Sequence, residues 1–292
     1  MSFSDLADLG RLAGLSAHEK RSLAEDLAHH LGSDWLATDV DAAMDALPLL
    51  HQSSGLIFLA IPGGEFQMGI SEQDLLELSE YVDWDWTTVG FVSPLTEKAR
   101  PVRRVRVEPF LCTRRLVANA DLTLHVQRGL NVPSLCDGGY EREATRQFAH
   151  SLGFRLPSEA ELEWLARDGS GAALVLDLMS GEDGKDEYDY RGDPEKPSRF
   201  GVLDQFNPQW AEDDFHPNYE GAPDTSGPWF GGDSRGVCRG SDNARYPELG
   251  QETIVWSLSG ARFERNAAGF RLAMPLDLAQ RPLPAQRDSG AQ

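Results

Sequence analysis

The sequence predicts an α+β protein in which a short N-terminal helical segment precedes an irregular domain. Leucines recur at helical spacing within residues 1–50. From residue 55 to about residue 275, glycine, proline, asparagine, aspartate and aromatic residues are frequent and helical periodicity is rare. The chain has 292 residues, of which 40% are hydrophobic, so it can bury a core without disulfides or a structural metal. We expect one domain at residues 55–275 and a mobile tail at residues 276–292.

The N-terminal segment has the signatures of consecutive short helices. Ser16 and Glu19 form the pattern of a capping box, in which each side chain binds the backbone N–H of the other residue. A stripe of leucines at a spacing of four follows on one helix face: Leu23, Leu27 and Leu31. We expect a third short helix at residues 39–47, ended by Pro48. Such a segment is typical of an adaptor that packs on the main domain or binds a partner helix.

Short strands and three helices are expected in the main domain. Apolar or alternating patterns predict strands at residues 55–61, 66–69, 102–110 and 269–273. Helices are predicted at residues 119–126, 141–152 and 158–167. The third helix has a clear start, because Ser158 follows a proline and precedes Glu161 by three residues. Arg155, Glu159 and Glu163 in this region are expected to form internal salt bridges.

The excess of acidic residues narrows the classes of function. The chain has 27 Lys and Arg against 47 Asp and Glu, a formal net charge of -20. Binding to nucleic acid relies on cationic side chains that displace counterions, so we expect no nucleic-acid partner. There is no run of about 18 apolar residues, and the opening MSFSDLADLG lacks the basic and apolar regions of a secretory signal, so we expect no membrane association or export. Three widely spaced cysteines (Cys112, Cys136 and Cys238) indicate a reduced, cytoplasmic protein.

Several sequence blocks, taken in order, resemble the formylglycine-generating enzyme (sulfatase-modifying factor) family. The blocks are residues 61–69 (IPGGEFQMG), 101–110 (PVRRVRVEPF), 116–119 (LVAN), 153–167 (GFRLPSEAELEWLAR), 200–204 (FGVLD), 237–240 (VCRG) and 269–272 (GFRL). The block at 153–167 is the closest match, because it resembles the family's Arg-Leu-Pro-Thr-Glu-Ala-Glu-Trp-Glu helix. The resemblance covers about residues 55–275 and implies the family's C-type-lectin-like fold, an irregular α+β unit.

The resemblance also identifies a departure from the family's oxidase chemistry. In the oxidase members, two cysteines beyond an Arg-Gly-Gly-Ser turn bind copper, and soft thiolates suit Cu(I). The turn here begins at Arg239, and the two cysteine positions fall on about Arg245 and Gly250, neither of which can bind copper. Cys238 precedes the turn and is expected to be a small buried residue on a strand. We therefore expect no copper-dependent oxidation of a substrate cysteine and no required cofactor.

A second block of the family, Gly-Asn-Val-Trp-Glu-Trp, helps to hold a calcium ion in its members. It corresponds here to residues 207–212 (NPQWAE). Asn207, Glu212 and Asp213 offer hard oxygen ligands that suit calcium or magnesium. Their spacing differs from that of the family, so these residues could hold calcium or could belong to a structural acidic loop.

The loops between the Trp210 block and the final strand are expected to build a groove. They are rich in aromatic residues and arginine, the residue types of binding hot spots. The expected ligand contacts are Trp210, Trp229, Arg239, Arg245, Tyr246, Trp256 and Arg262. Phe215, His216, Tyr219 and Phe230 lie in the same loops, and part of the whole set is expected to be core. We predict a non-oxidase binding or scaffolding protein with a protein or peptide partner, which could also use residues 1–50. The alternative is a divergent metal-dependent oxidoreductase with a rebuilt centre.

Overall fold

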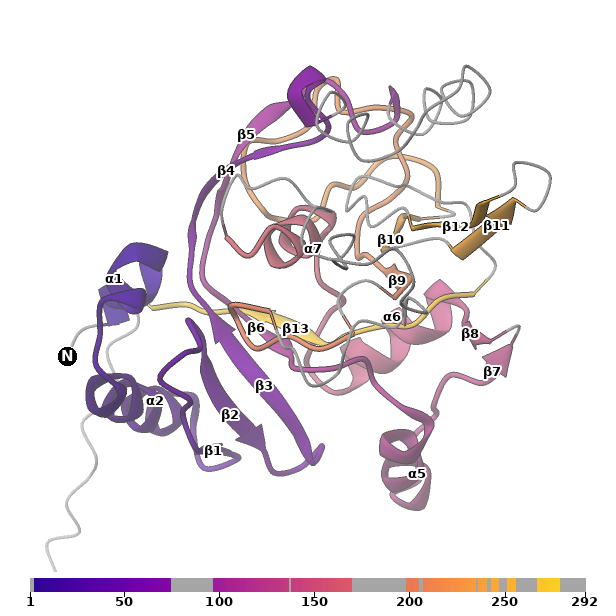
Figure 1. Ribbon diagram of the computed structural model, residues 1–292. Helices are drawn as coiled ribbons and strands as arrows, with labels where there is room; N and C mark the ends of the chain where they lie inside the picture. Colours follow the sequence, from indigo (N-terminus) through magenta and orange to yellow (C-terminus); the bar gives the residue numbers. More distant parts are fainter. Residues whose placement is uncertain are drawn as a thin grey trace, which may run out of the picture.

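A five-stranded antiparallel sheet lies at the centre of the computed structural model of the protein (Figure 1). In spatial order its strands are β1 (Trp35–Ala37), β2 (Leu47–His51), β3 (Leu56–Ile61), β6 (Phe110–Thr113) and β13 (Ala273–Pro275). The structure describes residues 3–74, 97–136, 138–169, 198–204, 207–234, 236–240 and 267–278, together with the backbone of 243–246 and 251–255. Strands from the two ends of the described chain therefore form the opposite edges of one sheet.

Helical elements open the chain, as the leucine spacing predicts. They are the 3-10 helix η1 (Phe3–Ala7), α1 (Leu9–Ala13) and α2 (Ala17–Leu31). The capping box of α2 is confirmed: the Ser16 N–H donates to a Glu19 carboxylate oxygen at 2.8 Å, and the Ser16 hydroxyl accepts from the Glu19 N–H. Leu23 and Leu27 are fully buried in the core beside the sheet. Because this stripe packs within its own chain, it is not exposed for a partner helix.

The prediction of a helix at residues 39–47 is wrong, and the N-terminal segment is not entirely helical. The chain forms β1 before this stretch and β2 at its end. Both strands belong to the central sheet, and β2 pairs with β3 along its whole length. A boundary at residues 50–55 would therefore fall inside a hairpin of the core sheet.

Lys20 on α2 provides the physical reason for this difference. Its ammonium group is buried and donates to the backbone oxygens of Ala42 at 3.2 Å and Met44 at 2.7 Å. It also pairs with the Asp45 carboxylate at 3.1 Å. A helix over this stretch would use the Ala42 carbonyl for its own hydrogen bond to the Ala46 N–H. The buried cation instead holds the segment in an irregular conformation that leads into β2.

The remaining elements surround the sheet and agree largely with the sequence prediction. β4 (Gly64–Met68) pairs with β5 (Arg103–Val107), and the helices are α5 (Asn119–Gln127), α6 (Arg142–Ser151) and α7 (Glu159–Ala166). Three short antiparallel ladders join β7 (Leu135–Cys136) to β8 (Gly139–Tyr140), β9 (Gln209–Trp210) to β10 (Cys238–Arg239), and β11 (Asn243–Tyr246) to β12 (Gln251–Val255). The final strand begins at Ala273, later than expected. Helices combined with antiparallel sheets make this an α+β protein.

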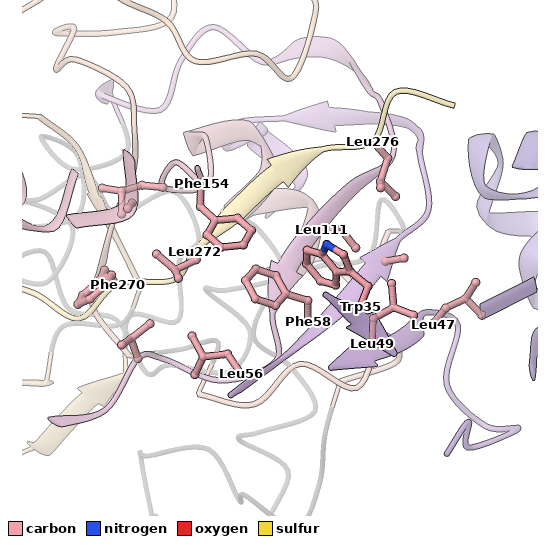
Figure 2. Packing of buried hydrophobic residues seen from close by; sticks show 14 of the residues in the cluster. Trp35, Leu47, Leu49, Leu56, Phe58, Leu111, Phe154, Phe270, Leu272 and Leu276 are labelled. Carbon is pink, nitrogen blue, oxygen red and sulfur yellow. The ribbon is translucent and has the colours of Figure 1, made fainter. Parts of the chain in front are cut away.

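Buried apolar side chains form a large core on each side of the sheet. In the first, Trp35, Phe58 and Phe154 point toward one another (Figure 2), with ring centroids 4.8 Å apart for Phe58 and Phe154. The second gathers β4, β5 and α7 around Trp164. A Cβ at Gly64 would lie 2.6 Å from the Trp164 ring, which explains a glycine at this point of β4. Within the described residues, the structure contains no helix that is both long and apolar enough to cross a membrane.

Candidate functional site

Trp210 and Arg239, two of the expected ligand contacts, lie on neighbouring strands but are buried. β9 and β10 pair with Cys238 opposite Trp210. Trp210 is 1% exposed, and its indole N–H donates to the Tyr140 carbonyl at 2.7 Å. Arg239 is 2% exposed. The prediction that these two side chains line an open groove is therefore corrected: both belong to the interior.

Arg239 is the centre of a buried network of charged side chains. Its guanidinium donates to Glu159 at 2.8 Å, to Glu163 at 2.6 Å and to the Tyr219 hydroxyl at 2.8 Å. Glu163 also accepts from Arg167 at 2.9 Å. Burial alone would raise the pKa of Glu163, but the charges of Arg239 and Arg167 lower it below its ordinary value. The expected internal salt bridges of Glu159 and Glu163 are confirmed, and their partner comes from a strand far along the chain.

Arg155 pairs at the start of the same helix, as expected. Its guanidinium binds both carboxylate oxygens of Glu161, at 2.7 Å and 2.6 Å. Glu161 also completes the capping box of α7, since it accepts from the Ser158 N–H at 2.8 Å. A bidentate ion pair of this kind fixes the orientation of both side chains in addition to pairing their charges. The helix start and its buried charges therefore form one structural unit.

Asp213 connects this buried region to an exposed loop. Its carboxylate accepts from the Glu159 N–H at 2.7 Å and from the Trp229 N–H at 3.0 Å. The adjacent Asp214 accepts from the Gly231 N–H at 3.0 Å. The two acids therefore hold residues 229–231 in a defined conformation. Burial, and then the charge of Glu159, raise the pKa of Asp213 from an ordinary 3.8 to about 7.

The raised pKa of Asp213 predicts a specific pH dependence of stability. An acid whose pKa is raised by folding stabilises the folded state below its unfolded pKa, and that stability is lost as pH rises through the folded pKa. An asparagine side chain cannot ionise, so Asp213→Asn should lack this pH dependence. We therefore expect the free energy of unfolding of wild type, measured relative to that of the variant, to decrease between about pH 4 and pH 8. The change should approach roughly 4 kcal/mol, since a tenfold difference in proton affinity between the folded and unfolded states corresponds to about 1.36 kcal/mol. Urea unfolding over this pH range measures the difference. A difference that does not change with pH would contradict the buried, desolvated position.

Glu212 and Asp213, two of the three candidate calcium ligands, accept hydrogen bonds from protein donors. Glu212 is 2% exposed, and its Oε1 accepts from Arg146 at 3.0 Å while its Oε2 accepts from the Leu156 N–H at 3.1 Å. Both oxygens of Asp213 accept from backbone N–H groups as well. In the described ranges, no group of three or more His, Cys, Asp or Glu side chains could hold a metal ion. Protein donors therefore use oxygens that a cation would need, which favours the structural-loop alternative, and the calcium site stays a prediction.

The described cysteines also differ in their surroundings. Cys112 and Cys238 are fully buried, and Cys136 is partly exposed. Burial raises the pKa of the Cys112 thiol to about 12. The expectation of a buried Cys238 on a strand is confirmed, since it lies on β10. A thiol held in its neutral form is a poor nucleophile and a poor metal ligand.

Three ring side chains and one arginine form a surface feature that we call the aromatic ledge: His216, Trp229, Phe230 and Arg146. Trp229 is half-buried and stacks on His216, with ring centroids 3.5 Å apart and planes 2° from parallel. Phe230 is 54% exposed, and the Arg146 guanidinium lies 6.0 Å from its ring centroid. The ledge thus contains one of the expected ligand residues, Trp229. The sequence Gly-Pro-Trp-Phe at residues 227–230 indicates an exposed turn. No pattern around Arg146 in the sequence indicates that its guanidinium lies beside the Phe230 ring.

The other expected ligand residues cannot be placed at this site. Arg245 and Tyr246 lie on β11, for which the structure describes the backbone only. Trp256 and Arg262 lie outside the described residues. Among the seven expected contacts, the structure therefore places Trp229 at the surface and Trp210 and Arg239 in the interior.

Comparison with known proteins gives a likeness of fold. No family model matches the sequence, and a search of curated proteins finds no match. Among solved structures, the chain is similar to PvdO from Pseudomonas aeruginosa, with a TM-score of 0.56 and 21% sequence identity. The match covers 76% of this chain and 95% of PvdO. At this identity the similarity concerns the fold, and it extends over nearly the whole of the solved chain.

Proposed function

We propose that this chain is a non-oxidase binding protein with a formylglycine-generating-enzyme-like, C-type-lectin-like domain. The sequence blocks that carry the resemblance support this fold through the positions of their residues. Glu159, Glu163 and Arg167 come from one block and Arg239 from another, and they meet in the buried network. Arg271, from the final block, is fully buried and donates to Gln209 at 2.8 Å. Residues from three of the blocks thus take part in buried interactions of the domain.

The chemistry of the described side chains favours binding over oxidation. The copper-cysteine positions of the family fall on about Arg245 and Gly250. Cys112 and Cys238 are enclosed in the core, and the oxygens of Glu212 and Asp213 already accept hydrogen bonds from the protein. Copper and iron centres need deprotonated or unoccupied ligand atoms. A rebuilt redox centre would have to use other residues.

The exposure of Phe230 is the observation that carries the proposed binding role. A large aromatic side chain at the surface, beside an arginine and on a loop held by hydrogen bonds to Asp213 and Asp214, has the properties of a binding hot spot. The carboxylates of Asp213 and Asp214 order the loop before any partner arrives, which reduces the entropy lost on binding. We propose a protein or peptide partner that covers Phe230 and Trp229. The net charge of -20 favours a basic partner.

Photocrosslinking at position 230 tests this proposal. A photoreactive phenylalanine analogue replaces Phe230 in the native host, and a second protein carries it at Leu135, which is similarly exposed at 57%. We expect position 230 to capture a discrete partner that position 135 does not capture. The purified partner should then bind Phe230→Ala at least about tenfold more weakly than wild type, a loss of about 1.4 kcal/mol.

Leu135→Ala supplies the matched control for the affinity measurement. It removes an exposed apolar side chain of comparable accessibility, so it should leave the partner's affinity within about twofold of wild type. Equal capture at both positions would mean non-specific contact with exposed apolar groups. An unchanged affinity for Phe230→Ala would reject the aromatic ledge as the binding site.

A further inference from the structure

A groove of about 960 Å³ separates part of α2 from the edge strand β1. Arg21, Glu25, Ala28 and His29 line it from α2. Gly32, Ser33 and residues 35–39 line it from the strand and its flanks. Figure 1 shows α2 beside β1 at the margin of the sheet. Within the part of the chain that the structure describes, β1 pairs with β2 on one side and with no strand on the other. The groove therefore follows an open edge of the central sheet.

The register of β1 shows which backbone groups point toward this open edge. The Thr38 N–H donates to the Pro48 carbonyl at 3.2 Å, which makes residue 38 a hydrogen-bonded position. Bonded and non-bonded positions alternate in an antiparallel pair, so Leu36 is the next bonded position. Trp35 and Ala37 therefore direct their backbone groups away from β2, toward the groove that they line.

These outward groups are suited to pairing with another strand. The Trp35 N–H donates to the Gly32 carbonyl at 3.1 Å, which leaves the Trp35 carbonyl and both backbone groups of Ala37 directed outward. Leu36 projects its side chain from the strand and is 48% exposed. An open strand edge beside an exposed apolar side chain is the arrangement that binds an extended peptide by strand addition.

Charge decides which extended segment fits. Glu25 and Asp39 line the groove together with one cation, Arg21. Two further acids, Asp26 and Asp41, are exposed nearby in the sequence, so acidic groups outnumber basic ones in this region. A second copy of the chain would bring the same acids and a net charge of -20 toward this edge. Like charges oppose that association, whereas a segment rich in lysine or arginine is attracted.

We propose that the α2–β1 groove binds an extended basic segment of a partner protein, which adds to the central sheet as a strand beside β1. Hydrogen bonds with Ala37 set the register of the added segment. Its side chains alternate between the face of Leu36 and the face of Trp35, so apolar residues can contact the sheet while basic residues reach Glu25 and Asp39. The site uses elements other than the aromatic ledge and does not depend on the proposed ledge function.

Fluorescence anisotropy with labelled peptides tests the proposal on the full chain. One eight-residue peptide alternates valine with lysine, and the other alternates valine with glutamate. We expect saturable binding of the lysine peptide alone, weakening as salt is raised. Ala37→Pro removes the outward N–H at an edge position that tolerates proline, and should weaken binding at least about tenfold. Glu25→Lys should weaken it similarly, whereas Asp224→Lys, an exposed site outside the groove, should leave it within about twofold.

Amide hydrogen exchange distinguishes strand addition from charge attraction. We expect the Ala37 amide of the wild-type protein to exchange at least about tenfold more slowly with the lysine peptide bound. If Ala37→Pro does not fold, this readout and Glu25→Lys still decide the question. The proposal is overturned if the lysine peptide does not saturate by about 1 mM, if the glutamate peptide binds equally well, or if Ala37 gains no protection. Protection of Ala37 that grows with protein concentration alone would instead identify a second copy as the occupant.

Discussion

Arg239→Ala is expected to lower the free energy of unfolding by roughly 3–5 kcal/mol, the range for removing one partner of a buried ion pair. The Arg239 guanidinium binds Glu159 at 2.8 Å and Glu163 at 2.6 Å, and these two acids are 2% and 0% exposed. Without the arginine, Glu159 would lose its contact with the Arg239 guanidinium, and Glu163 would keep Arg167 and the Gly69 N–H. Charges that lose their partners in the interior are strongly destabilising. Urea unfolding followed by tryptophan fluorescence measures the loss.

Two further substitutions make the Arg239 result interpretable. Arg104→Ala removes an arginine whose side chain is 72% exposed and pairs with Glu65 at the surface, so we expect a change within about 0.5 kcal/mol. Arg239→Lys keeps the positive charge but cannot bind two carboxylates in the same planar geometry, so its loss should be intermediate. If Arg239→Ala costs no more than Arg104→Ala, the buried network does not contribute to stability as described.

Trp210→Ala should cost about 3–5 kcal/mol, the usual range for removing a large aromatic side chain from a core. Trp210 is 1% exposed within the first core cluster, and its indole N–H donates to the Tyr140 carbonyl at 2.7 Å. The substitution removes apolar contacts, leaves a cavity and breaks this hydrogen bond. Thermal and urea unfolding of the purified variant measure the effect.

Trp229→Ala is the matched comparison, because it removes the same residue type from the aromatic ledge. Trp229 is half-buried and stacks on His216, so its removal should cost clearly less stability than the removal of Trp210. Trp229→Ala should instead weaken the binding of the partner that is captured at position 230. Similar stability losses for both tryptophans would contradict the assignment of one to the core and the other to the binding surface.

Secondary structure is predictable from this sequence where its cause is local. Ser16 with Glu19, and Ser158 with Glu161, form capping boxes within four residues, and both helices begin where these pairs predict. The strand at residues 55–61 follows from its own run of apolar residues. In each case the interacting groups lie close together in the chain, so no knowledge of the fold is needed.

Prediction fails where the deciding partner is distant. Residues 39–47 have a helical pattern, but Lys20 binds the carbonyls of Ala42 and Met44, and the segment is irregular until β2 begins. Glu212 and Asp213 suit a cation by their chemistry alone. Their oxygens instead accept from Arg146 on α6, from Leu156 in the segment before α7 and from Glu159 at the start of α7, all at least 54 residues away in the sequence.

The sequence by itself determined the α+β class, the helix starts and the acidic charge. These properties depend on composition and on neighbours along the chain. Only the tertiary structure decided that Trp210 and Arg239 are interior, that Trp229 lies at the surface, and that β1 is an edge strand beside a groove. Burial and pairing depend on which distant segments meet. A tryptophan or an arginine has the same identity in a core and in a binding site, and its surroundings alone separate the two roles.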